Sequence, residues 1–507
     1  MNFQTRSHSI GEVIQRIALT DPASLAILSS GYRPFSYAQL LDQINCVAQS
    51  LKALGFDASG RIAVYVKDSA QAALAVVAVA CSAVAVPLDP SLEETEIALR
   101  LRLIDADACC ALHGETTAAR NAALRCGIPF IELIPADDQT LGFSLSAAEG
   151  VLKRQHHTSV PDTTAVIFQT SGTTAEPKLV PCLHSNVLAT TSNARTWFNL
   201  GAHDRCLCLA PPYYSHGLTL TILAPLLSGG SVAFPSSLFR VSLPEWFEML
   251  GPTWFSASPA MLLMISEMLE TVPTGLKHQL RFASSGGAQL PATVRASLER
   301  LLGIHILEHY GMTEASQISA NLPPPGRNKP GTAGIPPSGT VMIAGPDGNH
   351  APQGETGEIL VRGSNVMPGY IHNPACNPEA YRDGWFRTGD LGYFDNEGFL
   401  HINGRIKELI NRGGEKISPF EIEAILMQHP HVLEAAAFAV PHPRLGDDIG
   451  AAVVLQPGTT VAADEFRRFM RTKTSWNKIP RRVHVVESIP RGPGGKVLRN
   501  HMSGVFS

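Results

Sequence analysis

The sequence predicts an α/β protein with three parts: a large N-terminal domain of layered α/β subdomains, a β-rich subdomain, and a small α+β C-terminal domain. The chain has 507 residues, which is too long for one ordinary hydrophobic core and indicates several domains. Its first 160 residues alternate helix-like and strand-like segments, as parallel sheets with covering helices do. From about residue 330, short strands separated by Gly and Pro turns take over.

Apolar spacing predicts the individual elements of the N-terminal part. Residues 37–54 repeat apolar positions with a helical period, and residues 61–68 and 84–89 resemble buried strands on either side of an Ala-rich helix. Three further strand-like runs follow, at 164–170, 205–212 and 281–287. This order of elements predicts parallel α/β layering.

The character of the chain changes again after Gly404-Arg405. Residues 419–427 and 464–471 are amphipathic helix candidates among short strands. We therefore expect a separate C-terminal α+β domain to begin near this point.

Composition excludes several classes of function. Hydrophobic residues make up 44% and charged residues 17% of the chain, as in ordinary globular enzymes, and the net charge of -4 does not favour binding to nucleic acid. The most apolar stretch, residues 72–88, is short for a membrane span and ends in Pro87 and Asp89, so a buried helix running into a strand is the better interpretation. Nine scattered cysteines lack metal-site spacing and predict reduced thiols in a cytoplasmic protein.

The first motif that carries chemistry is the sequence QTSGTTAEPK at residues 169–178, which follows a strand. Hydroxyls and backbone N–H groups in such a loop can cradle a polyphosphate, and Lys178 adds a point charge. The spacing is not that of the usual P-loop. The alternative is a plain Ser/Thr-rich surface turn.

Two further motifs supply aromatic and acidic groups. In the sequence YGMTE, Tyr310 can stack on a base, and Glu314 is a hard oxygen ligand suited to Mg²⁺ or, alternatively, a charge at a helix N-terminus. In WFRTGDLG, Asp390 follows a Gly turn, where it could accept hydrogen bonds from both ribose hydroxyls or simply cap the turn.

The last two motifs lie in the C-terminal part, at residues 404–418 and 490–499. Lys496 lies on a Gly/Pro-rich loop, from which its ammonium could reach a developing negative charge. The alternative for any single surface lysine is solvation.

Taken together in this order and spacing, the five motifs resemble the adenylate-forming superfamily of acyl-CoA synthetases, peptide-synthetase adenylation domains and luciferases, nearest the oxalate- and coumarate-CoA ligase branch. The resemblance covers essentially the whole chain. It also includes PLDP near residue 87 and the segments 285–288, 354–358 and 478–480.

The resemblance implies a role for each matching residue. The ATP/AMP-binding set would be Thr170, Ser171, Gly172, Thr173, Thr174, Lys178, Gly286, Gly287, Ala288, Tyr310, Gly311, Met312, Thr313, Asp390 and Arg405. The catalytic set would be Lys496, Thr173 and Glu314, with Glu314 also the metal ligand. The acid pocket and thiol tunnel would be lined by Tyr214, His216, Phe255, Ser256, Ser284, Ser285 and Gly414.

The resemblance also implies the organisation of the chain and its reaction. Residues 1–404 would form the AMP-binding domain, 405–407 a hinge centred on Lys407, and 408–507 a mobile domain carrying Lys496. ATP and Mg²⁺ would activate a small carboxylic acid as an acyl-AMP with release of pyrophosphate. The acyl group would then pass to coenzyme A or to the phosphopantetheine of an acyl carrier protein.

The sequence departs from the family pattern at a few positions. Ala175 and Leu179 replace glycines of the phosphate loop, which restricts the backbone, yet we still expect activity. Tyr214 takes the place of the gating aromatic or His, although Tyr213 or Tyr214 could be a core residue. Ser215 replaces the Asp that would pair with an ammonium, so an α-amino acid is not the expected substrate.

The remaining pocket residues do not identify the acid that is the substrate. His216 could contact a polar or second carboxylate group or could simply bind backbone, and the neutral lining favours a modest acyl or aryl acid. A silent nucleotide-binding protein and a light-emitting oxidase are the other functions considered; the intact motifs argue against the first. We expect a monomer or a homodimer.

Overall fold

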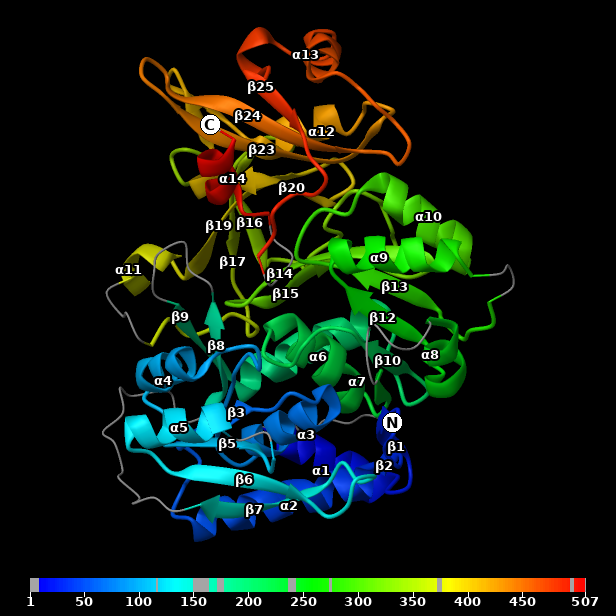
Figure 1. Ribbon diagram of the computed structural model, residues 1–507, viewed down its shortest axis with the longest axis vertical. Helices are drawn as coiled ribbons and strands as arrows, with labels where there is room; N and C mark the ends of the chain where they lie inside the picture. The colour runs from blue at the N-terminus through cyan, green and yellow to red at the C-terminus, as the bar shows by residue number, and fades with distance from the viewer. Residues whose placement is uncertain are drawn as a thin grey trace.

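The computed structural model describes residues 9–114, 117–148, 164–170, 177–235, 243–272, 276–371, 376–492 and 497–506. Two large sheets, each flanked by helices, form the main body, and the orange and red C-terminal segments lie at one end of it (Figure 1). The predicted α/β fold is confirmed.

The first large sheet has seven strands with a parallel centre and antiparallel strands at both edges. Its strands, in order across the sheet, are β7 (Phe143–Ala148), β6 (Phe130–Pro135), β5 (Ala108–Leu112), β3 (Arg61–Tyr65), β4 (Val84–Pro87), β8 (Thr164–Thr170) and β9 (Lys178–Leu183). The strands β3, β4 and β5 are buried at every residue, as their continuous apolar sequence predicts.

The second large sheet has eight strands, and it too is parallel except at its two edges. In order they are β15 (Ser316–Ala320), β14 (His305–Met312), β13 (Phe282–Ser285), β12 (Trp254–Ala257), β10 (Arg205–Cys208), β11 (Ser231–Phe234), β1 (Leu25–Ser29) and β2 (Phe35–Ser36).

Helices cover both large sheets (Figure 1). They are α1 (Ile10–Thr20), α2 (Tyr37–Ala53), α3 (Ser69–Ala80), α4 (Glu94–Leu103), α5 (Thr117–Cys126), α6 (His184–Phe198), the π-helix η1 (His216–Leu223), α7 (Ala224–Leu227), α8 (Leu243–Leu250), α9 (Pro259–Glu270) and α10 (Ala292–Leu302). The helix α3 is almost wholly buried and runs into β4, as the apolar stretch predicts. None of the helices in the described ranges is long and apolar enough to cross a membrane.

Two smaller sheets follow in the chain. The strands of one are β16 (Val341–Ala344), β17 (Gly357–Val361), β19 (Trp385–Phe394) and β18 (Tyr381–Arg382), with β20 (Leu400–Arg405) paired to β19. The strands of the other are β22 (Glu415–Ile417), β21 (Ile410–Arg412), β24 (Gly446–Leu455) and β23 (Val432–His442), with β25 (Arg482–Val485) paired to β24. The associated helices are α11 (Asn377–Ala380), η3 (Ile406–Glu408), α12 (Pro419–Leu426), α13 (Ala463–Arg471), η4 (Trp476–Lys478) and α14 (Arg499–Val505).

A buried tyrosine joins the N-terminal helices to the second large sheet. The side chain of Tyr37, at the start of α2, is fully buried, and its hydroxyl lies 2.6 Å from the carbonyl of Leu226 and 2.7 Å from that of Gly230. The Leu226 carbonyl also accepts from the amide of Gly229, and the Tyr37 hydroxyl adds a side-chain hydrogen bond where α7 gives way to β11.

We therefore expect Tyr37→Phe to destabilise the protein by about 1–3 kcal/mol, because it removes a buried hydrogen-bond donor that lies between the carbonyls of Leu226 and Gly230. The check is the midpoint of urea unfolding. A matched control is Tyr393→Phe, at a half-buried ring that stacks on His401. An equal shift of the midpoint in both variants would contradict this account of Tyr37.

Candidate active site

The base of the predicted phosphate loop is a β-hairpin. The strands β8 and β9 are antiparallel, and Thr170 pairs with Lys178 at the end of the ladder that the loop connects. The two ends of the loop thus lie side by side. The predicted residues Ser171, Gly172, Thr173 and Thr174, and Ala175 beside them, lie outside the described residues.

Lys178 and Glu314, two predicted site residues far apart in the sequence, meet through Tyr370. The Lys178 ammonium lies 4.4 Å from the centre of the Tyr370 ring, a cation–π contact. The hydroxyl of Tyr370 donates a 2.8 Å hydrogen bond to Oε1 of Glu314. The base of the phosphate loop and the predicted metal ligand therefore share one buried aromatic side chain.

Glu314 lies in the tight turn between β14 and β15, so it is not a charge at a helix N-terminus. Its side chain is buried, and within the described residues Tyr370 binds one of its two carboxylate oxygens. One oxygen then remains to serve a cation. Mg²⁺ is commonly held by one or two carboxylates together with substrate phosphates and water, so this single carboxylate fits it.

Tyr310, Asp390 and Arg405 form a second cluster. Tyr310 Oη donates to Asp390 Oδ2 at 2.5 Å, and Arg405 Nε lies 2.9 Å from Asp390 Oδ1. Asp390 and Arg405 are cross-strand partners of β19 and β20. Asp390 therefore lies within a strand and does not cap a turn. Burial, followed by the Asp390 carboxylate, raises the pKa of Tyr310 far above its usual range, so this hydroxyl stays a donor.

The predicted adenine turn follows β13. Gly286 is buried, while Gly287 and Ala288 are exposed. A Cβ atom on Gly286 would lie 2.2 Å from Nε2 of His309, so only glycine allows the chain to pass this ring. Tyr310 follows His309 on β14, and the turn and the tyrosine are therefore held on neighbouring strands. Gly311 and Met312 end β14, and Thr313 begins the turn that carries Glu314.

Neutral polar side chains gather on one face of the second large sheet. His216 stacks on His309 with ring centres 5.3 Å apart, and Ser284 Oγ donates to Ser256 Oγ at 2.7 Å. His216 Nε2 and His309 Nδ1 are buried and have no hydrogen-bond partner within the described residues. Burial lowers the pKa of His216 to about 4, so its imidazole is neutral at pH 7.

The other two predicted pocket residues on these strands point to the opposite face. Phe255 is fully buried in the core beneath α8, α9 and α10, and Ser285 lies in register with Ala257 of the same core. Alternate residues of a strand face opposite sides, which separates Phe255 and Ser285 from Ser256 and Ser284. One sheet therefore does not present all four side chains to a single pocket.

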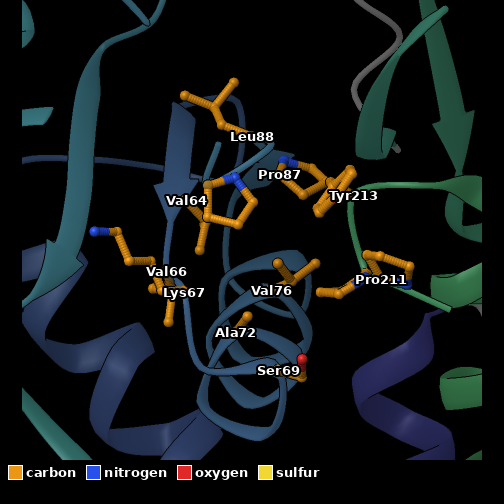
Figure 2. Close-up of a pocket in the computed structure, with 12 residues that line it drawn as sticks. Val64, Val66, Lys67, Ser69, Ala72, Val76, Pro87, Leu88, Pro211 and Tyr213 are labelled. Carbon is orange, nitrogen blue, oxygen red and sulfur yellow. The ribbon is translucent and has the colours of Figure 1, made fainter. Parts of the chain in front are cut away.

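The predicted gate lies beside a small cavity. The rings of Tyr213 and Tyr214 lie 4.6 Å apart, and both residues are half-buried. Tyr213 borders a cavity of about 130 Å³ at the carboxyl ends of β3, β4 and β10, where proline rings make up much of the wall and Lys67 points away from Tyr213 (Figure 2). The lining residues are Val64, Val66, Lys67, Ser69, Ala72, Val76, Pro87, Leu88, Pro90, Pro211, Pro212 and Tyr213.

The C-terminal predictions are only partly described. Lys407 is exposed in η3, two residues after Arg405 and one residue before Glu408. Gly414 is exposed in the turn between β21 and β22 with a φ of 93°, a conformation that favours glycine. Lys496 lies outside the described residues.

Sequence reasoning missed three features of this site. Tyr370 lies in irregular chain without motif spacing, and His309 looks like one more residue of an apolar strand. The π-helix η1 begins at His216; such helices are rare and frequently occur at functional sites. The sequence signal for this helix was the glycine at position 217. Only glycine fits there, because a Cβ would lie 2.0 Å from the carbonyl oxygen of Pro211.

Comparison with known proteins places this geometry in a family. The model of the AMP-binding enzyme family matches residues 14–371, and that of the AMP-binding enzyme C-terminal domain matches residues 421–496. The chain belongs to the AMP-binding enzyme family. The resemblance predicted from the five motifs is thereby confirmed.

Individual relatives agree over nearly the whole chain. A probable CoA ligase of Humulus lupulus is 33% identical and is aligned over 95% of this chain and 93% of its own. An oxalate–CoA ligase of Arabidopsis thaliana is 31% identical over 99% of both. The crystal structure of ATP-bound MatB from Rhodopseudomonas palustris, 27% identical, covers 98% of this chain and all of its own with a TM-score of 0.86. Such relatives confirm the prediction of an AMP-forming acid–thiol ligase.

The neutral histidine pair predicts a pH-dependent stability. The His216 imidazole titrates near pH 6.5 in the unfolded chain but at about 4 in the fold, where burial disfavours its charged form. The unfolded state therefore binds more protons between these values, and stability falls as pH drops from about 6.5 to about 4. His309, whose pKa burial and His216 also lower, acts in the same direction.

We expect His216→Gln to flatten this dependence, with a smaller loss of melting temperature between pH 7 and pH 4.5 than in the wild type. The measurement is thermal unfolding followed by circular dichroism. His203→Gln, at an exposed histidine, is the matched control and should keep the wild-type slope. A slope that is the same in all three proteins would show that His216 does not contribute.

Proposed function

We propose that this chain activates a small carboxylic acid with ATP, releases pyrophosphate, and passes the acyl group from acyl-AMP to the thiol of coenzyme A. In the first step a carboxylate oxygen attacks the α-phosphorus, and the bond to the bridging oxygen of pyrophosphate breaks. In the second, the thiolate sulfur attacks the acyl carbonyl and AMP leaves. The observation that carries the proposal is the convergence of Lys178, Tyr370 and Glu314.

The two clusters would divide the binding of ATP between them. Lys178, held over Tyr370 at the base of the loop, would neutralise phosphate charge, and Glu314 would hold Mg²⁺. Bound there, Mg²⁺ would draw phosphate oxygens together and offset their charge. Asp390 has spare lone pairs on both oxygens and, with Arg405, would bind the ribose hydroxyls.

The C-terminal segment would supply the mobile part of the mechanism. Residues 405–407 would form the hinge, and the mobile domain would follow it. During adenylation, Lys496 of this domain would contact the carboxylate of the acid and the α-phosphate of ATP. Attack by the thiol would require Lys496 to leave the site and the thiol to approach past Gly414. Lys407 would therefore be the hinge residue about which the domain turns between the adenylation and the thioester-forming states. The nine cysteines are all free thiols, which supports a reducing, cytoplasmic location.

The polar face of the second large sheet suits a substrate that is a compact acid with a further hydrogen-bonding group. His216 and His309 each keep a buried nitrogen without a partner in the described residues, and leaving such an atom unpaired is costly. An oxygen-bearing group on the acid would satisfy them. The oxalate ligase relative acts on an acid of this kind, although the neutral lining here suits an uncharged polar group better than a second carboxylate.

The decisive experiment measures pyrophosphate release across a library of carboxylic acids, with and without coenzyme A. The library should contain pairs of acids that differ only by one oxygen-bearing group, and a parallel arm should offer phosphopantetheinylated carrier proteins. We expect release to depend on the acid and Lys496→Ala to lower it by at least about a hundredfold, because charge stabilisation at the α-phosphate is lost.

Three outcomes would each contradict one part of the proposal. No pyrophosphate release with any acid would refute the adenylation step. Transfer only to carrier proteins, with coenzyme A inert, would refute the proposed acceptor. Equal release by the wild type and Lys496→Ala would remove that lysine from its proposed role.

Glu314→Gln separates the two half-reactions. The variant keeps the size of the side chain but removes the charge, so adenylation should fall by about a hundredfold, whereas thioester formation from supplied acyl-AMP should stay within about threefold of the wild type. Glu355→Gln, at an exposed glutamate, is the control. Equal losses in both half-reactions would show that the role of Glu314 is not confined to the metal-bound triphosphate.

A further inference from the structure

Two arginines hold the ends of the segment that is proposed to carry the catalytic lysine. Arg491 Nη2 lies 2.9 Å from Glu434 Oε2, and Arg499, at the start of α14, pairs with Glu423 and with Glu408. The amide of Leu498, just before Arg499, donates to the carbonyl of Pro490, just before Arg491, at 2.9 Å. The described residues at the two ends of this segment are therefore bonded to each other.

Arg499 is the more deeply placed of the two anchors. Its side chain is only 11% exposed, and its guanidinium lies 4.9 Å from the centre of the Phe420 ring. Nη2 donates to both oxygens of Glu423, at 2.7 and 3.0 Å, and Glu423 also accepts from the amide of Ala437 at 2.8 Å. The planar fork of arginine suits this arrangement in a way that the point charge of lysine does not.

The second partner of Arg499 connects it to the proposed hinge. Nη1 lies 3.1 Å from Oε2 of Glu408, the last residue of η3, and Glu408 follows Lys407 directly. At the other end of the same turn, Arg405 pairs with Asp390. One ion pair thus joins the start of the hinge turn to the proposed ribose site, and another joins its end to the first residue of α14.

The two contacts of Arg499 differ in burial. The Glu423 side chain is 15% exposed, so losing its partner leaves a largely buried charge, whereas Glu408 is 28% exposed. A rearrangement of η3 that carries Glu408 away therefore costs less than one that breaks the contact with Glu423. Arg499 can keep α14 anchored while it releases the hinge turn.

We propose that Arg499 is a positioning residue for the adenylation step, fixing the base of the 490–499 segment against the hinge turn through Glu408. The inference rests on the proposed function of Lys496. It concerns how that lysine is placed, and it predicts that a side chain outside the nucleotide site sets the rate of one half-reaction and not of the other.

The test compares Arg499→Met, Arg499→Lys and Glu408→Gln with Arg467→Met. Arg467 is a matched control in the same part of the chain, since its ion pair with Asp464 lies on α13, away from this segment. Two rates are measured for each variant: acid-dependent pyrophosphate release, with the KM for ATP, and thioester formation from supplied acyl-AMP. Circular dichroism and the melting temperature monitor folding.

Arg499→Met should lower kcat for pyrophosphate release by about tenfold to a hundredfold, because small misplacements of a catalytic group are costly, with the KM for ATP within about twofold of the wild type. Thioester formation from acyl-AMP should stay within about threefold. Arg499→Lys should recover part of the loss, and Glu408→Gln, which leaves the Glu423 contact intact, should show a smaller loss of the same kind.

Other results would overturn the inference. Equal losses in both half-reactions would indicate a merely structural role for Arg499, and an unaltered kcat in both Arg499→Met and Glu408→Gln would exclude positioning. If Arg499→Met fails to fold, Glu408→Gln alone decides the question. Failure of the proposed function is distinguishable, because it would appear as wild-type protein without acid-dependent pyrophosphate release.

Discussion

The segment 364–371 holds the site together, because it bonds both large sheets at once. Asn365 Nδ2 donates to the carbonyls of Ala315 and Gln317, and the amide of Met367 donates to the carbonyl of Glu314. At the other end of the segment, Tyr370 lies against Lys178. This irregular strip therefore adds direct contacts between the phosphate-loop hairpin, which belongs to the first large sheet, and the acidic turn, which belongs to the second.

Asp390 and Arg405 form an ion pair at the site, whereas Lys178 and Glu314 each contact the neutral side chain of Tyr370. Asp390 is buried between Tyr310 and Arg405, where a partner offsets the cost of desolvation. On the neighbouring face of the second large sheet, histidines and serines are neutral. In the proposed complex, the nucleotide would thus lie beside charged side chains and the acid beside neutral ones.

Local patterns in the sequence predicted more of the fold than of the site. The helix at 37–54 and the strands at 61–68 and 164–170 were predictable because periodicity reports burial directly, and the predicted bounds differ from the observed ones by only a few residues. Phe255 and Ser285 seemed equivalent to Ser256 and Ser284 because strand register and the choice of face depend on the packed helices. Tyr370 could not be predicted, because its role comes from a contact with Glu314, which lies 56 positions away in the sequence.

The pairing of Asp390 with Arg405 has a structural consequence. The two residues face each other across β19 and β20, and the ladder ends where η3 begins. An insertion of one residue into the connecting turn, if it shifted the pairing, would move Arg405 to the opposite face of the sheet and displace the start of the hinge with it. The length of this hairpin is therefore constrained by two features at once, the pairing of Asp390 with Arg405 and the position at which η3 begins.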